Sequence, residues 1–158
     1  MRVSIVTISD SVSSGSREDL SGKALAERCE KLGWEVISKS VVPDDEALIR
    51  AQLLALANSA KVDAVLTTGG TGVGPRDVTP EATAAVVTRQ VPGLAELMRQ
   101  TGVQKTRKAA LSRAIAGIRG ECLIINLPGS PRGAVESFDA IAELLPHAVD
   151  VLHGARHD

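Results

Sequence analysis

The residues best suited to chemistry form a glycine loop, Gly69-Gly70-Thr71-Gly72-Val73-Gly74, with an aspartate, Asp77, three residues beyond it. Glycine reaches positive φ angles and has no Cβ atom, so a backbone of this composition can approach a ligand closely. Successive N–H groups in such loops form concave anion sites, and the N-terminus of a following helix adds positive potential. The loop therefore predicts a phosphate-bearing ligand, and the carboxylate of Asp77 suggests a metal ion beside it.

Two better-known phosphate motifs do not fit this loop. A Walker A loop ends in Gly-Lys-Ser/Thr, whereas Gly74 is followed here by Pro75 and Arg76. The dinucleotide fingerprint G-x-G-x-x-G fails as well, because Pro75 stands where the third glycine is required. A tight strand-to-helix turn without a ligand is the remaining alternative. The number of glycines favours anion binding over that alternative.

Two further acidic residues, Asp44 and Asp45, precede a predicted helix, as Asp77 does. An aspartate at such a position commonly caps the helix. Asp77 is less easily explained as a cap, because Thr79 is better placed for that role. Mg²⁺ in phosphate chemistry is bound by one or two carboxylates together with substrate phosphates. We therefore expect Asp77 and Asp44 to bind Mg²⁺, with Asp45 as the alternative to Asp44.

Other polar residues lie in turns where a second anion could bind. Ser112 and Arg113 precede a predicted strand, and Asn126 and Ser130 flank a Pro-Gly turn. Each of these residues also fits an ordinary turn or capping role. The segment from Lys105 to Arg119 carries five basic residues and no acidic one, and it either binds substrate or faces the solvent.

None of the three histidines falls in a loop near these residues. His147, His153 and His157 lie close to the C-terminus and are expected on the surface. A serine or cysteine nucleophile activated by histidine is therefore not supported. Transfer between phosphates needs no such base, because a phosphate monoester with a second pKa of about 6 is already an anionic nucleophile at pH 7. Positioning and charge neutralisation then become the main requirements.

The composition argues against several classes of function. A formal net charge of -1, one Trp, one Phe and no Tyr leave neither a basic field nor stacking platforms for nucleic acid. No apolar run is long enough to cross a bilayer, and no signal peptide precedes the first predicted strand. Cys29 and Cys122 match no metal or redox spacing. We expect one compact cytoplasmic domain spanning residues 1–158, without membrane or nucleic-acid partners.

Apolar runs and helical patterns alternate along the chain. Strands are predicted over 3–8, 34–42, 64–68, 114–118 and 122–126; helices over 23–32, 43–60, 79–87 and 94–102; a loop over 9–21; and a final helix after 131 that Pro146 ends or kinks. This order predicts an α/β fold with a mostly parallel sheet covered on both faces, and a hairpin at Arg119-Gly120. Ligands bind at the carboxyl ends of such strands, so Ser9, Asp44, the glycine loop and the Pro128-Gly129 turn should meet at one rim.

Four motifs follow one another in a specific combination that covers nearly the whole chain. They are Thr68-Gly69-Gly70-Thr71-Gly72, Pro75-Arg76-Asp77-Val78-Thr79-Pro80-Glu81-Ala82, Ser112-Arg113-Ala114-Ile115-Ala116-Gly117 and Asn126-Leu127-Pro128-Gly129-Ser130-Pro131. Together they resemble the molybdopterin-binding domain of molybdenum-cofactor biosynthesis proteins. Within that family, the single-domain form with the Pro-Arg-Asp-Val-Thr-Pro run resembles the molybdopterin adenylyltransferases.

This resemblance implies a three-layer α/β/α fold, a homotrimer, and Mg²⁺-dependent transfer of AMP from ATP to the terminal phosphate of molybdopterin. Pyrophosphate would be released, and a partner enzyme that inserts molybdate would receive the product. By position, Asp77 and Asp44 match the family's two functional acids, as catalytic residues and metal ligands. The substrate-binding residues then expected are Ser9, Thr68, Gly69, Gly70, Thr71, Gly72, Ser112, Arg113, Asn126, Pro128, Gly129 and Ser130.

Two other classes of function stay open at this point. One is a molybdopterin-binding or carrier protein of the same pathway without catalysis, and the presence of both Asp44 and Asp77 argues against it. The other is a plain oligomerisation scaffold, which predicts no stabilisation by ligands.

Overall fold

The computed structural model describes residues 1–156, so His157 lies outside the described residues, while His147 and His153 are exposed as predicted. Its strands are β1 (Arg2–Ile8), β2 (Glu35–Val42), β3 (Ala64–Thr68), β4 (Arg89–Gln90), β5 (Ala116–Arg119) and β6 (Cys122–Leu127). They form one sheet in the order β2-β1-β3-β6-β5-β4. β1, β2, β3 and β6 are parallel, and β5 runs antiparallel to β6 and to β4, a two-residue strand that the sequence pattern did not predict. The mostly parallel sheet with an antiparallel hairpin is thus confirmed.

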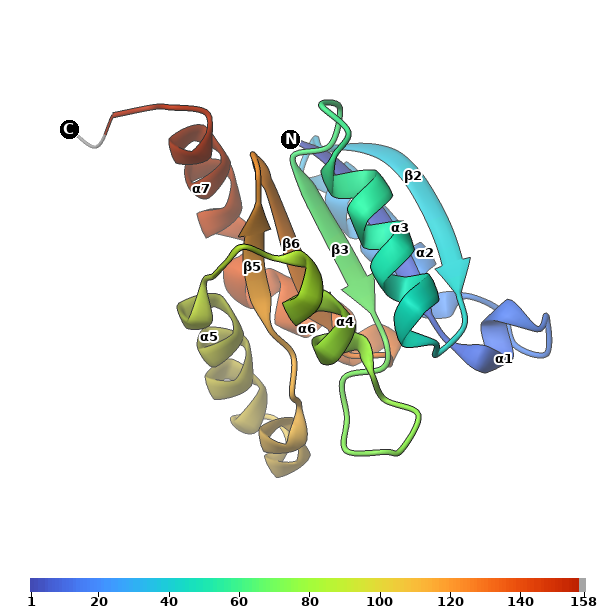
Figure 1. Ribbon diagram of the computed structural model, residues 1–158. Coiled ribbons are helices and arrows are strands. Elements are labelled where there is room, and N and C mark those ends of the chain that lie inside the picture. Colours follow the sequence, from blue (N-terminus) through green and yellow to red (C-terminus); the bar gives the residue numbers. More distant parts are fainter. Residues whose placement is uncertain (157–158) are drawn as a thin grey trace.

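Helices cover both faces of this sheet and make the predicted three layers (Figure 1). The α-helices are α1 (Asp10–Ser13), α2 (Leu20–Lys31), α3 (Glu46–Ala57), α4 (Thr79–Val86), α5 (Pro92–Val103), α6 (Pro131–Ile141) and α7 (Leu145–Leu152), and the 3₁₀ turns are η1 (Arg107–Leu111) and η2 (Ala142–Leu144). α3 and α4 lie on one face, and α2, α5, α6 and α7 on the other. Among residues 1–156, no helix combines the length and apolar character needed to span a membrane.

The two faces of the sheet are packed by alternate residues of each strand. In β6, Leu123, Ile125 and Leu127 join a core that contains Phe138 of α6, whereas Ile124 joins the core under α3 and α4. Side chains of a strand alternate between faces, so a strand buried on both sides must be apolar at nearly every position. This explains why the strands appear in the sequence as continuous apolar runs.

Helix boundaries differ from the sequence-based prediction where capping residues lie inside the segment 9–21. Ser9 caps the short helix α1 within the predicted loop, because its Oγ accepts a hydrogen bond from the third N–H beyond it. Asp19 does the same for α2, which therefore begins at Leu20 rather than at residue 23. Pro146 lies in the first turn of α7, where proline is tolerated, so it begins a helix instead of ending one.

The carboxyl ends of the parallel strands all point to one end of the molecule. Figure 1 shows α1 and the long loop after β3 at the end towards which the β2 and β3 arrows point. The N-terminus and α7 lie at the opposite end. The topology therefore brings the loops that carry the predicted site residues together at one rim of the sheet.

Candidate active site

Hydrogen bonds join neighbouring loops just beyond the strand ends. The Ser9 N–H donates to the carbonyl of Val42 at 3.0 Å, linking the ends of β1 and β2. The Thr68 hydroxyl donates to the carbonyl of Pro128 at 2.7 Å, linking the ends of β3 and β6. These bonds fix the relative positions of the loops that carry the candidate residues.

The glycine loop passes so close to its surroundings that side chains are excluded at its start. Gly69 and Gly70 have φ angles of +106° and +69°. A Cβ atom on Gly69 would lie 2.2 Å from the carbonyl oxygen of Ile8, and one on Gly70 would lie 2.2 Å from Oγ1 of Thr79. Glycine is therefore required at both positions by conformation and by space.

Thr79 has a different role from the predicted helix cap. The residue at the N-cap of α4 is Val78, which makes no side-chain capping bond. Thr79 is fully buried; its hydroxyl donates to the carbonyl of Gly69 at 2.9 Å, and its N–H donates to the carbonyl of Gly70 at 3.1 Å. The capping prediction was wrong because the glycine loop folds back over the start of α4 and takes this hydroxyl.

Four consecutive loop carbonyls, those of residues 69–72, are bound by scaffold donors. Thr79 binds the first two, and Arg113 binds the next two through its N–H (2.8 Å to Thr71) and its Nε (2.7 Å to Gly72). In a trans peptide the N–H points opposite to the C=O, so the N–H groups of residues 70–73 point away from these donors. Within residues 1–156, none of these four N–H groups has a hydrogen-bond acceptor. A row of unpartnered amides is the structural feature that binds anions in such loops.

Asp44 and Asp45 are distinguished by their contacts. Asp45 caps α3, since its Oδ1 accepts a hydrogen bond from the Leu48 N–H at 3.0 Å. Asp44 instead exchanges two hydrogen bonds with Asp10: each residue's N–H donates to the other's carboxylate, at 2.9 and 3.0 Å. Asp44 also lines a cavity of about 380 Å³ together with Asp77. Asp44, rather than Asp45, therefore lies beside Asp77.

The surroundings of Asp44 disfavour its ionised form. Partial burial raises the pKa of its carboxyl group, and the charges of Asp10 and Asp77 raise it further; the Asp10 N–H and the Arg76 guanidinium offset part of this effect. Arg76 also forms an ion pair with Asp10 at 2.9 Å, and this hydrogen-bonded pair holds the pKa of Asp10 below its usual range. A cation at the rim would relieve the repulsion among these carboxylates.

An Asp44→Asn variant is expected to have a higher Tm than the wild type at neutral pH. Because the folded-state pKa is raised, ionising Asp44 destabilises the folded state, and this penalty is present at pH values above that pKa. The amide keeps an oxygen for the Asp10 N–H but carries no charge. The gain in Tm should shrink as the pH falls through the raised pKa and vanish below the ordinary carboxyl range, about pH 4. Calorimetry across pH measures this; an equal gain at every pH would exclude ionisation of Asp44 as its cause.

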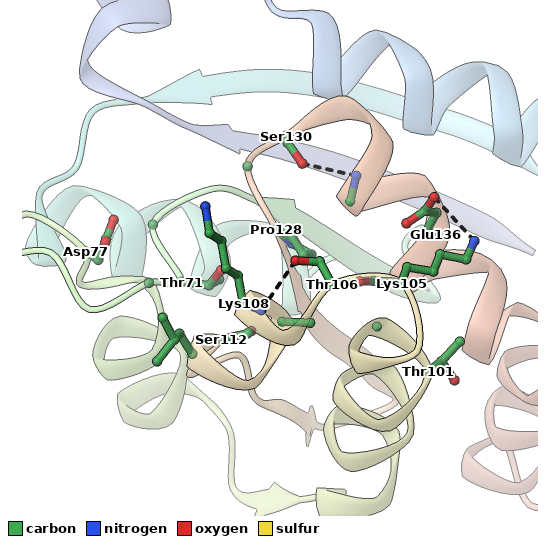
Figure 2. Close-up of a pocket in the computed structure, with 18 residues that line it drawn as sticks. Thr71, Asp77, Thr101, Lys105, Thr106, Lys108, Ser112, Pro128, Ser130 and Glu136 are labelled. Atoms are coloured by element: carbon green, nitrogen blue, oxygen red, sulfur yellow. Dashed lines mark hydrogen bonds and ion pairs between the residues drawn. The ribbon is translucent and has the colours of Figure 1, made fainter.

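A second cavity, of about 440 Å³, adjoins the first. Figure 2 shows the residues that line this second cavity. Among the residues that the structure describes, Gly70, Asp77, Gly129 and Ser130 line both cavities. Figure 2 shows Asp77 on one side of the second cavity and the ion pair between Lys105 and Glu136, 3.3 Å apart, on the other. Two cavities that meet at one carboxylate can hold two reactants with their ends adjacent.

Most residues predicted for the site line one of these cavities. Those that do are Ser9, Asp44, Thr68, Gly69, Gly70, Thr71, Gly72, Asp77, Ser112, Pro128, Gly129 and Ser130. The two that do not are Arg113, which binds the glycine loop, and Asn126.

Asn126 lies beneath the rim. Its side chain is fully buried, its Oδ1 accepts from the Ile115 N–H, and its Nδ2 donates to the hydroxyls of Thr67 and Thr83 at 3.1 and 2.9 Å. These bonds occupy the donors and the acceptor of the amide. They tie the strands β3 and β6 to α4, so Asn126 supports the rim from below in this structure.

The sequence did not predict that two residues of the site, Asp10 and Arg76, form an ion pair with each other. Their ion pair joins the short helix α1 to the segment that follows the glycine loop, across 66 residues of sequence. The position of Asp10 directly after the predicted strand was the one available signal for its place at the rim. Its partner could not be found from sequence, because the contact depends on the folding of both loops.

The basic segment from Lys105 to Arg119 is divided by the fold. Lys105 and Lys108 line the larger cavity, and Lys108 lies at its side towards the glycine loop (Figure 2). Arg119 lies elsewhere, where its Nη1 donates to the carbonyl of Val86 at 3.0 Å. One end of the segment thus faces the site, and the other is bonded to the last residue of α4.

The donor set at the rim fits a hard divalent cation that is also bound by a substrate. Among residues 1–156, no group of three or more His, Cys, Asp or Glu side chains is arranged to hold a metal ion alone. Asp44 and Asp77 supply carboxylate oxygens to one cavity, beside amides suited to phosphate. Mg²⁺ characteristically binds in this way, through one or two carboxylates and substrate phosphates.

The fold and the site define an α/β protein with two adjoining cavities and a row of unpartnered amides at the carboxyl ends of its strands, the place where ligands bind in such sheets. Residues 4–147 match the family model described as a probable molybdopterin binding domain. The chain belongs to this family, which confirms the resemblance found in its motifs.

Similar proteins support this membership over nearly the full chain. A molybdopterin adenylyltransferase of Helicobacter pylori is 40% identical over 156 residues, which is 98% of this chain and 89% of the relative. A molybdopterin adenylyltransferase of Escherichia coli K12 is 38% identical over 157 residues, covering 98% and 79%. Among solved structures, the molybdopterin biosynthesis enzyme MoaB of Thermus thermophilus is 47% identical, with a TM-score of 0.91 and 99% of both chains covered.

Proposed function

We propose that this protein is a molybdopterin adenylyltransferase, which transfers AMP from ATP to the terminal phosphate of molybdopterin and releases pyrophosphate. The observation that carries the proposal is the meeting of two cavities at Asp77, beside the unpartnered amides of residues 70–73. The names of the relatives support the same activity. A carrier would need only the molybdopterin site, whereas this rim offers room for two reactants.

The two reactants are assigned to the cavities by their linings. We assign the nucleotide to the 380 Å³ cavity, where Asp44, Ser9 and the glycine loop lie. We assign molybdopterin to the 440 Å³ cavity, where Ser112 and the Pro128–Ser130 turn lie, with Lys105 and Lys108 as added positive charge. The phosphates of both then face the glycine amides and Asp77.

The reaction is one displacement at phosphorus. An oxygen of the molybdopterin phosphate forms a bond to the α-phosphorus of ATP, and the bond from that phosphorus to the bridging oxygen of pyrophosphate breaks. The attacking phosphate is already anionic, so no proton need be removed. The chain's contribution is to hold both phosphates in line and to bind their charge with backbone amides and lysines.

A bound Mg²⁺ would neutralise phosphate charge, and Asp77 and Asp44 are the residues that would hold it. We also propose that the protein acts in the cytoplasm as a homotrimer and passes adenylylated molybdopterin to a molybdate-inserting partner. The family membership supports this extension.

Incubation of the protein with molybdopterin and ATP labelled at the α-phosphate is expected to give labelled adenylylated molybdopterin and an equal amount of unlabelled pyrophosphate. A thermal shift accompanies it: ligand at about 100 times its Kd adds about 2.7 kcal/mol of stability. Stabilisation by molybdopterin without product would indicate a binding protein. If molybdopterin and ATP gave no stabilisation and no product formed, an oligomerisation scaffold would be the remaining function.

A further inference from the structure

We propose that Arg113 is a positioning residue, which holds the glycine loop and Asp77 by their backbone and does not contact substrate. This inference rests on the proposed function, because it assigns Arg113 a part in the same reaction. It replaces the expectation that Arg113 binds substrate, an expectation drawn from its place in the Ser112-Arg113 motif.

Every donor group of Arg113 is directed to the loop or to the helix that follows it. Its N–H binds the carbonyl of Thr71 at 2.8 Å, its Nε that of Gly72 at 2.7 Å, and its Nη2 that of Asp77 at 2.7 Å. Its Nη1 forms an ion pair with Glu81 in the first turn of α4. One residue therefore binds both ends of the segment 71–77, and Asp77 closes that segment through its carboxylate bond to the Gly74 N–H at 2.9 Å.

These bonds set the direction of the peptide groups that face the ligand. Holding the carbonyls of Thr71 and Gly72 directs the N–H groups of Gly72 and Val73 to the opposite side, away from Arg113. Holding the carbonyl of Asp77 fixes the backbone from which its carboxylate projects. Arg113 thereby controls both elements of the proposed chemistry, the amides and the acid, without lining either cavity.

The charge and shape of arginine fit this role. Its positive charge is neutralised locally by Glu81, so it does not act as a free cation towards phosphate. The planar guanidinium presents several donors in fixed directions, which two carbonyls and a carboxylate require together. Lysine keeps the charge but offers a single flexible ammonium group, so it cannot replace these bonds at once.

The test compares Arg113→Lys with Arg119→Lys, a matched control in which a guanidinium also binds a carbonyl, that of Val86, outside both cavities. In the substrate-free protein, Arg113→Lys should speed hydrogen–deuterium exchange of the hydrogen-bonded amides of Gly74 and Asp77 by about tenfold, because the side-chain hydrogen bonds that hold the loop closed are lost. The kcat of adenylyl transfer should fall by about tenfold or more, as for other residues that orient a reacting group. Arg119→Lys should leave loop exchange and kcat within about twofold of the wild type.

Unchanged exchange of the loop in Arg113→Lys would overturn the proposal, whatever the activity. Failure of adenylyl transfer in the wild type would remove the proposed function, yet the exchange measurement would still test the role of Arg113 in the loop.

A second measurement needs no variant: inorganic pyrophosphate is added to the ¹⁵N-labelled wild-type protein. The amides of Gly72 and Val73 should shift in the NMR spectrum, while the Nε–H of Arg113 stays nearly unchanged. A large shift of Nε–H without shifts of those amides would show direct contact and overturn the proposal.

Discussion

Adenylyl transfer by an Asp77→Asn variant is expected to fall by about 10²-fold or more, the usual effect of removing a preorganised electrostatic group from a reaction site. Asp77 lines both cavities, so its carboxylate lies where the phosphates of the two proposed reactants would meet. The amide keeps an oxygen for the Gly74 N–H, so the turn itself is preserved. Molybdopterin should still bind, because the lining of its cavity is otherwise intact. Initial rates and calorimetric titration with molybdopterin measure the two effects separately.

Asp45→Asn is the matched control for this variant. Asp45 carries the same side chain at the same rim, but its carboxylate caps α3, a role that asparagine performs equally well. Its activity should stay within about twofold of the wild type. If Asp77→Asn also retained wild-type turnover, Asp77 would only build the turn, and the proposed assignment of the reaction to this site would fail.

The second large effect is expected from Gly70→Ala, which should lower the free energy of unfolding by about 3 kcal/mol. A non-glycine residue at φ +69° is strained by about 1–2 kcal/mol. The new Cβ would also lie 2.2 Å from Oγ1 of Thr79, and displacing that hydroxyl breaks its buried bond to Gly69, at a further cost of about 1–3 kcal/mol. For a chain of this length, the Tm should fall by about 6–12 °C.

Gly33→Ala separates strain from steric overlap. Gly33 has a similar φ of +77°, but a Cβ built there would have no atom of residues 1–156 within 4 Å, apart from those of Gly33 and its chain neighbours. This variant should therefore show the conformational cost alone, about 1–2 kcal/mol, or about 2–8 °C in Tm. Equal losses of Tm in the two variants would mean that the Thr79 hydroxyl moves away from the new Cβ without a loss of stability. The glycine loop would then be held less rigidly than its hydrogen bonds indicate.

The elements of the fold were predictable where burial dictates composition. Strands buried on both faces, such as β3 and β6, must be apolar at most positions, so their runs are visible in the sequence. The two-residue strand β4 was not predictable, since its pairing depends on where β5 lies. The start of α2 was missed because Asp19 stood within a polar segment that resembles a loop.

Within the site, the sequence alone determined the glycine loop, because only glycine can fill positions such as Gly70, and it placed Asp77 and the Pro128-Gly129 turn at the same rim. It could not choose between Asp44 and Asp45, since both precede α3; the hydrogen bond of Asp45 to α3 made the choice. It also could not show that Thr79 bonds to the loop instead of capping a helix, or that Arg113 bonds to the loop, although it was expected to bind a substrate. The physical reason is that residue type and spacing record what the local backbone requires, whereas the partner of a side chain depends on which distant segment packs against it. The tertiary structure alone therefore decided the direction of these hydrogen bonds, and with it the orientation of the loop's amides.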